Sequence, residues 1–119
     1  MKKIIIVRIR EMVMGGISKT AIDLLKNLDN KKYKIVFFIE RDLRENNCFL
    51  DEIPKEIDIY FLKNYESIKK IEEVSLKKKK IFFNIKYNLL REYNRYISNK
   101  KFLNFLKKNK EIKAIIDFD

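Results

Sequence analysis

The residues best suited to chemistry are two adjacent glycines, Gly15 and Gly16, the only glycines in the chain. They precede Ser18 and Lys19 and lead into an amphipathic segment. A glycine turn that leads into a helix presents unpaired backbone N–H groups and the positive end of the helix dipole, which suit a phosphate. Ser18 could cap the helix, and Lys19 could add positive charge. The pattern predicts a substrate- or phosphate-binding loop at these four residues, with a tight turn that binds nothing as an equal alternative.

The loop matches neither of the best-known phosphate motifs. It is not G-x-G-x-x-G, and it is not a Walker A loop, because Ser18 rather than glycine precedes Lys19. The prediction therefore rests on the position of the glycines between a strand and a helix.

Several catalytic chemistries are excluded by composition. The chain has no histidine and one cysteine, Cys48, which excludes a structural zinc site and a histidine general base carried by this chain. Carboxylates near the predicted strand ends could serve catalysis, but no two of them form a convincing pair: Glu11, Glu40, Asp42, Asp117 and Asp119. The sequence therefore assigns no catalytic residue and no metal ligand.

The elements that must position the loop alternate between strand and helix. Apolar, β-branched runs predict buried parallel strands, and apolar residues at helical spacing predict a helix. The expected strands are Lys3–Arg8, Tyr33–Glu40, Ile57–Leu62 and Ile112–Phe118, and the expected first helix is Ile17–Leu28. This order predicts one α/β domain over residues 1–119, a Rossmann-like three-layer half domain. It would have about four mainly parallel strands and helices on both faces. A strand order of 3-2-1-4 would place the glycine loop at a switch point, where ligands bind.

The segment from Ser67 to Asn109 is predicted to be helical with interruptions. The expected pieces are Ile68–Val74, Leu76–Ile97 and Lys101–Lys108, with a break at Ser98-Asn99. The ring-rich second piece follows a lysine run, Lys77, Lys78, Lys79 and Lys80. This piece could lie on an anionic membrane with the lysines at the headgroups. A core helix behind a solvated lysine run is the favoured alternative.

The net charge of +11 is compatible with a polyanionic partner. However, Ile, Lys and Asn make up 52 of the 119 residues, a bias that AT-rich codons also produce. No RRM, KH or helix-turn-helix signature is present, so nucleic acid is not the expected partner. The N-terminal apolar run, Ile4–Val7, is too short for a signal peptide. The sequence predicts a cytoplasmic protein, with peripheral attachment at the inner membrane face left open.

The stretch from Lys3 to Glu40 resembles the opening of a GT-B glycosyltransferase of the family 4 (group 1) type. That family begins with an apolar strand, a loop ending in Gly-Gly, a helix with a leucine-rich face and a D-x-x-x-Y-x-V/I phrase. The corresponding residues here are Ile4–Val7, Gly15-Gly16, Leu24-Leu25-Leu28, and Asp29, Tyr33 and Ile35. The later LDEIPKEIDIYFL resembles the approach to the third strand of the family. Ile17-Ser18-Lys19 stands where many members carry Ala-Glu-Arg, with Lys19 in the place of the cation.

The resemblance implies the N-terminal, acceptor-side domain of a glycosyltransferase for polysaccharide biosynthesis. Such an enzyme moves a sugar from a nucleotide-sugar donor to a glycan or lipid-linked acceptor. A second domain carries most donor contacts in the family, so the missing C-terminal domain is the implied partner and this portion is expected to be inactive alone. No cofactor is expected here beyond the donor of the parent enzyme. The alternative is a stand-alone basic α/β module for anionic membrane or nucleic acid. An exposed sheet edge or uncovered helix face would favour a homo-oligomer.

Overall fold

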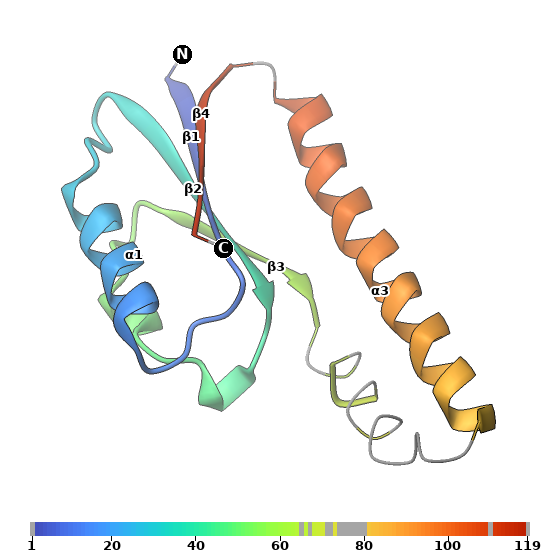
Figure 1. Ribbon diagram of the computed structural model, residues 1–119. Coiled ribbons are helices and arrows are strands. Elements are labelled where there is room, and N and C mark those ends of the chain that lie inside the picture. The colour runs from blue at the N-terminus through green and yellow to red at the C-terminus, as the bar shows by residue number, and fades with distance from the viewer. Residues whose placement is uncertain are drawn as a thin grey trace.

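The structure, a computed structural model, describes residues 2–64, 66, 68–70, 73, 81–109 and 111–118, with the backbone alone at 81–87. Strands and helices alternate along the chain (Figure 1). The elements are β1 (Lys3–Ile9), α1 (Gly16–Asn27), β2 (Tyr33–Arg41), the 3-10 turns η1 (Arg44–Asn46) and η2 (Leu50–Glu52), β3 (Asp58–Lys63), α3 (Ile81–Lys108) and β4 (Ile112–Asp117).

The four strands form one sheet in the order β3-β2-β1-β4, and every adjacent pair is parallel. The predicted order 3-2-1-4 is therefore confirmed. In the two central strands, Val7 pairs with Phe37, and Val7 also lies opposite Ile116 of β4. Central strands of a parallel sheet are covered on both faces, so nearly every side chain must be apolar. This explains the unbroken apolar runs in β1 and β2.

Helix α1 covers one face of the sheet. Its buried apolar residues Ala21, Ile22 and Leu25 recur at helical spacing. They belong to one core cluster with alternate residues of the central strands, including Val7 and Phe37. The α1 helix therefore packs through the stripe that the sequence predicts.

Helix α3 covers the opposite face of the sheet. Because successive strand side chains point to opposite faces, the residues between those that contact α1 point toward α3. Ile6 and Phe38 lie on this face and pack against Phe102 and Phe105 of α3. The Phe38 ring centroid lies 5.1 Å from that of Phe102 and 5.0 Å from that of Phe105, both in edge-to-face geometry. Figure 1 shows α1 and α3 on either side of the sheet. The fold is thus a three-layer, Rossmann-like α/β half domain, as predicted.

The predicted helix break at Ser98-Asn99 is wrong, because α3 runs without interruption through both residues. Ser98 is only 1% exposed, and its hydroxyl donates a hydrogen bond to the Asn94 carbonyl oxygen at 2.9 Å. A serine that bonds back to the carbonyl four residues earlier is satisfied within a helix. The lysine run at 77–80 lies outside the described residues, and the piece predicted at Ile68–Val74 is described only in part.

Within the described part of the chain, no helix combines the length and the apolarity needed to cross a bilayer.

Candidate functional site

The glycine loop lies between the end of β1 and the start of α1, at the carboxyl edge of the sheet. β1 is paired with β2 on one side and β4 on the other. The chain leaves β1 toward β2 and β3, and returns through α3 to β4 on the far side. This reversal is the switch point at which open α/β sheets bind ligands. The predicted location of the loop relative to the sheet is therefore confirmed.

The two glycines differ in backbone conformation. Gly15 is the residue before α1 and has φ +152° and ψ 174°, a conformation that essentially only glycine adopts. Gly16 is the first residue of α1 and has no positive φ. A Cβ atom added at either position would have no neighbouring heavy atom within 4 Å. Packing therefore requires neither glycine, and the space beside the first turn of α1 is open.

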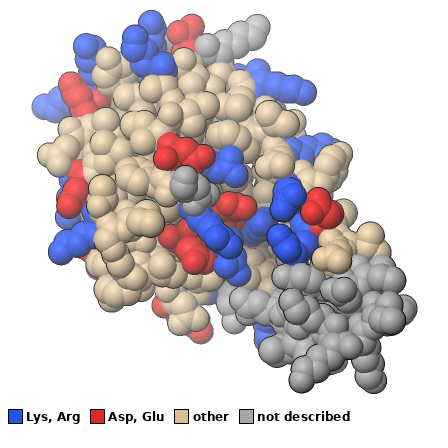
Figure 2. Space-filling view, viewed as in Figure 1, with Lys and Arg blue, Asp and Glu red and all other residues tan. Residues whose placement is uncertain are grey.

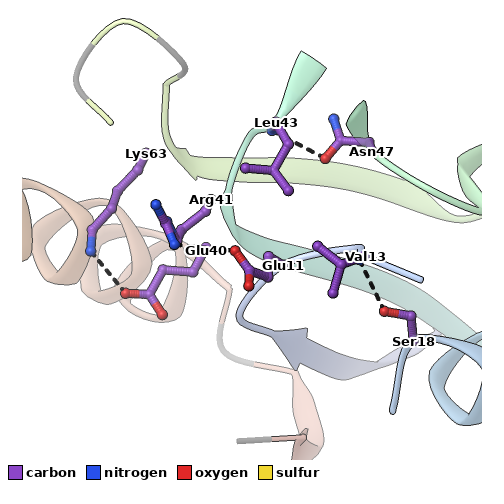
Figure 3. Close-up of polar contacts among 8 residues, drawn as sticks. All are labelled: Glu11, Val13, Ser18, Glu40, Arg41, Leu43, Asn47 and Lys63. Carbon is purple, nitrogen blue, oxygen red and sulfur yellow. Dashed lines mark hydrogen bonds and ion pairs between the residues drawn. The ribbon is translucent and has the colours of Figure 1, made fainter. Parts of the chain in front are cut away.

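Ser18 is not the helix N-cap, so that prediction is wrong. Because α1 begins at Gly16, the capping position falls on Gly15, and no side chain caps the helix. Ser18 lies inside the first turn, is only 2% exposed, and its Oγ accepts a hydrogen bond from the Val13 backbone N–H at 3.2 Å (Figure 3). Ser18 therefore ties the loop to the helix from the buried side.

Lys19 and both glycines are exposed, unlike Ser18. The Lys19 backbone N–H donates to the Gly15 carbonyl oxygen at 3.3 Å, the first helical bond of α1. The loop also exposes apolar surface, since the Met14 and Ile17 side chains are mostly exposed. The structure thus brings the four predicted residues into one turn, in which three of them are exposed to solvent.

The loop is anchored at its base. Met12 is fully buried in the α1-side core, and its carbonyl oxygen accepts a hydrogen bond from the Cys48 backbone N–H at 2.8 Å. The Arg41 N–H donates to the Arg10 carbonyl oxygen at 2.9 Å. These bonds fix the path of the chain before it reaches the glycines.

Two half-buried ion pairs line the carboxyl edge beside the loop (Figure 3). Glu11 lies 3.2 Å from the Arg41 guanidinium, and Glu40 lies 3.1 Å from the Lys63 ammonium. The two carboxylates are thus each neutralised by a neighbouring cation. The Glu11–Arg41 pair links the loop after β1 to the end of β2, and the Glu40–Lys63 pair links the ends of β2 and β3.

A turn held by polar side chains follows β2. Asp42 accepts hydrogen bonds from the Arg44 backbone N–H at 2.8 Å and from the Asn47 side chain at 2.9 Å. The side-chain Oδ1 of Asn47 in turn accepts a hydrogen bond from the Leu43 backbone N–H at 3.1 Å (Figure 3). Arg44 and Phe49 both have positive φ in this segment. Asp42 is thus a turn residue, which matches the strong tendency of Asp and Asn side chains to bond nearby backbone groups.

Arg8 lies near the carboxyl end of the central strand β1, and the sequence did not single it out as a site residue. It lies on the α3 side of β1, and its guanidinium carbon is 4.8 Å from the centroid of the Phe102 ring. Its Nε is buried and has no hydrogen-bond partner among the described residues. The available signal in the sequence was a charged residue, Arg8, between two apolar residues near the end of the strand. It supplies a cation at the switch point, across the sheet from the glycine loop.

The residues that the structure describes contain no group of three or more Cys, Asp or Glu side chains that could hold a metal ion. Asp117 lies at the end of β4, opposite Arg8 in the strand register. Asp119 and the run from Lys77 to Lys80 fall outside the described residues.

Comparisons of the chain with protein-family models, with curated proteins and with solved structures find no match. The glycosyltransferase resemblance therefore stays a prediction from the residues that carry it. The fold and the position of the loop define a Rossmann-like half domain with an open glycine loop at its switch point.

Proposed function

We propose that the chain is the N-terminal, acceptor-side portion of a GT-B glycosyltransferase. The parent enzyme would transfer a sugar from a nucleotide-sugar donor to a glycan or lipid-linked acceptor. The observation that carries the proposal is the open space around Gly15 and Gly16 at the switch point of the sheet. A glycine at the first position of α1 is favoured by neither packing nor backbone conformation, so close approach of another group is a physical reason for it.

The roles of the loop residues follow from their exposure. The first amides of α1 have no partners within the helix and can donate to a diphosphate or to an acceptor oxygen. Lys19 adds a positive charge on the exposed side of the same turn. Ser18 holds the loop in place through Val13 and acts as a positioning residue.

The described residues supply binding and orientation. The carboxylates Glu11, Glu40 and Asp42 are engaged in ion pairs or in a turn. A second domain would face the loop across a cleft and provide most contacts to the donor. Under this proposal the 119 residues alone transfer no sugar.

The alternative, a basic module for anionic membrane or nucleic acid, has less support. In the face shown in Figure 2, Lys and Arg side chains are interspersed with Asp and Glu side chains. Three of the cations beside the candidate site form ion pairs: Arg41, Arg44 and Lys63. Dispersed and paired charge gives a weaker attraction to a polyanion than one continuous basic patch.

Two observations test the proposal. The coding sequence is expected to continue past the Asp119 codon into a second α/β domain. A stop codon there, with no such domain downstream in any frame, contradicts the proposal. The isolated chain, incubated with a panel of nucleotide sugars and glycan acceptors, is expected to form no product. Sugar transfer by the 119 residues alone would contradict the proposal that a second domain is needed for activity.

A further inference from the structure

Helix α3 carries a row of exposed apolar side chains. Leu89, Tyr93, Tyr96 and Leu103 are 67%, 62%, 61% and 52% exposed. They follow one another at three- or four-residue steps, with Lys100 filling the remaining step, so they form one stripe along the helix. The Lys100 ammonium lies 5.9 Å from the centroid of the Tyr96 ring. We call Leu89, Glu92, Tyr93, Tyr96, Lys100 and Leu103 the outer stripe.

The outer stripe lies on the side of α3 that faces away from the sheet. The residues that face the sheet are Asn94, Ser98, Phe102 and Phe105, which are buried or half-buried. At 100° per residue, Asn94, Ser98 and Phe105 lie roughly 160° to 180° from Tyr96 around the helix, and Phe102 lies roughly 120° from it. Figure 1 shows α3 as an outer layer of the molecule with one long side free of the other labelled elements. Helix α3 thus has two apolar sides, and the fold covers only one of them. Exposed large apolar side chains arranged as a patch are typical of interaction surfaces.

Four residues of the outer stripe lie symmetrically about Tyr96, whereas the position symmetric with Tyr93 is Asn99. Leu89 and Leu103 each lie seven residues from Tyr96, and Glu92 and Lys100 each lie four residues from it. If two copies of α3 pack antiparallel with their Tyr96 residues at the centre, each leucine faces a leucine and each Glu92 faces a Lys100. Such a two-fold interface requires the same patch on both copies to be self-complementary. The two leucines meet this requirement in apolarity, and Glu92 and Lys100 meet it in charge.

We propose that the outer stripe of α3 is the interface of a homodimer in which the two α3 helices pack antiparallel about Tyr96. The partner is a second copy of this chain. The Glu92 carboxylate is 3.4 Å from Arg95 of its own helix and its side chain is 65% exposed, so it can also reach Lys100 of the second copy. Two such reciprocal ion pairs flank the central tyrosines. Glu92 and Lys100 leave the outer stripe with no net charge, so the stripe itself offers an anionic membrane no net attraction, whereas a second antiparallel copy can pair both charges. This inference does not depend on the proposed glycosyltransferase function.

The test measures the mass of the chain in solution and then exchanges the charges of Glu92 and Lys100. Light scattering and sedimentation of the 119-residue chain are expected to give about twice the chain mass of 14.5 kDa at high concentration. Glu92→Lys and Lys100→Glu, made singly, place like charges opposite each other and are expected to shift the chain to monomer. The double variant, Glu92→Lys with Lys100→Glu, restores opposite charges and is expected to restore the dimer. Rescue by the double variant separates pairing from any effect on folding.

Two further variants of α3 serve as a matched control and as a disruption of the proposed interface. Lys101→Glu makes the same charge change one residue along the helix, off the stripe, and is expected to leave the dimer intact. Tyr96→Glu places two carboxylates at the centre and is expected to abolish it, with the circular dichroism spectrum unchanged. A monomer at all concentrations overturns the proposal. So does a dimer that both single charge variants leave intact. Binding of the monomeric chain to anionic phosphatidylserine vesicles, abolished by Tyr96→Glu, would also overturn it.

Discussion

The two adjacent glycines provide the sharpest test of how the loop is built, because they differ in backbone conformation and share the same open surroundings. Gly15→Ala places a Cβ on a residue at φ +152° and ψ 174°, where side chains are strained whatever the space. A residue held in such a region costs on the order of 1–3 kcal/mol. The expected result is a loss of about that size in the free energy of unfolding.

Gly16→Ala is the matched control. Gly16 is helical, and an added Cβ would meet nothing within 4 Å. Replacing glycine by alanine at a compatible position reduces the entropy of the unfolded chain and stabilises by about 0.4–1 kcal/mol. The two substitutions, one residue apart, are therefore expected to have opposite signs.

The measurement is chemical denaturation of both variants and the wild-type chain by urea, followed by circular dichroism. Unchanged slopes would show that both variants expose the same surface on unfolding. Equal destabilisation by the two substitutions would refute the reasoning. It would mean that a Cβ at position 16 is not accommodated and that the backbone conformation of Gly15 does not distinguish the two positions.

Three further substitutions test the fold around the site. Ser18→Ala leaves the Val13 N–H without its partner and is expected to cost about 1–3 kcal/mol by denaturation, whereas Thr20→Ala, at an exposed hydroxyl, should change stability by less than about 0.5 kcal/mol. Phe38→Ala removes the ring that contacts three aromatic side chains and should cost about 3–5 kcal/mol; a loss under about 1 kcal/mol would show that α3 does not pack there. Ser98→Pro interrupts a continuous helix and should cost about 3 kcal/mol or more, and a neutral result would restore the predicted break.

The sheet could be predicted from the sequence because its strands are simple. Each central strand is an apolar, β-branched run with polar residues at its ends, and only a sheet covered on both faces accommodates two such runs. The order 3-2-1-4 is one that the alternation of strands and helices permits, and it is the order observed. The glycine loop was located correctly relative to the sheet for the same reason, since the carboxyl ends of parallel strands share one edge.

The errors concern polar residues with more than one local bonding option. Ser18 can cap a helix or bond a loop amide, and only the position of Gly15 as N-cap decides between the two. Ser98 is compatible with a helix end or with a buried bond to the Asn94 carbonyl. The choice depends on what α3 packs against, which is a tertiary property. The contact between the Arg8 guanidinium and the Phe102 ring joins residues far apart in the sequence, so no local pattern could predict it.

Binding of a diphosphate at the glycine loop tests the central claim most directly. Amide spectra of the ¹⁵N-labelled chain are recorded during titration with uridine diphosphate, with uridine as the control that lacks phosphate. The expected result is a shift of the Gly15, Gly16 and Ile17 amides with the diphosphate alone, and its loss in Gly16→Val. Shifts elsewhere only, no shift at all, or an equal response in Gly16→Val would contradict the assignment of the loop as a phosphate-binding site.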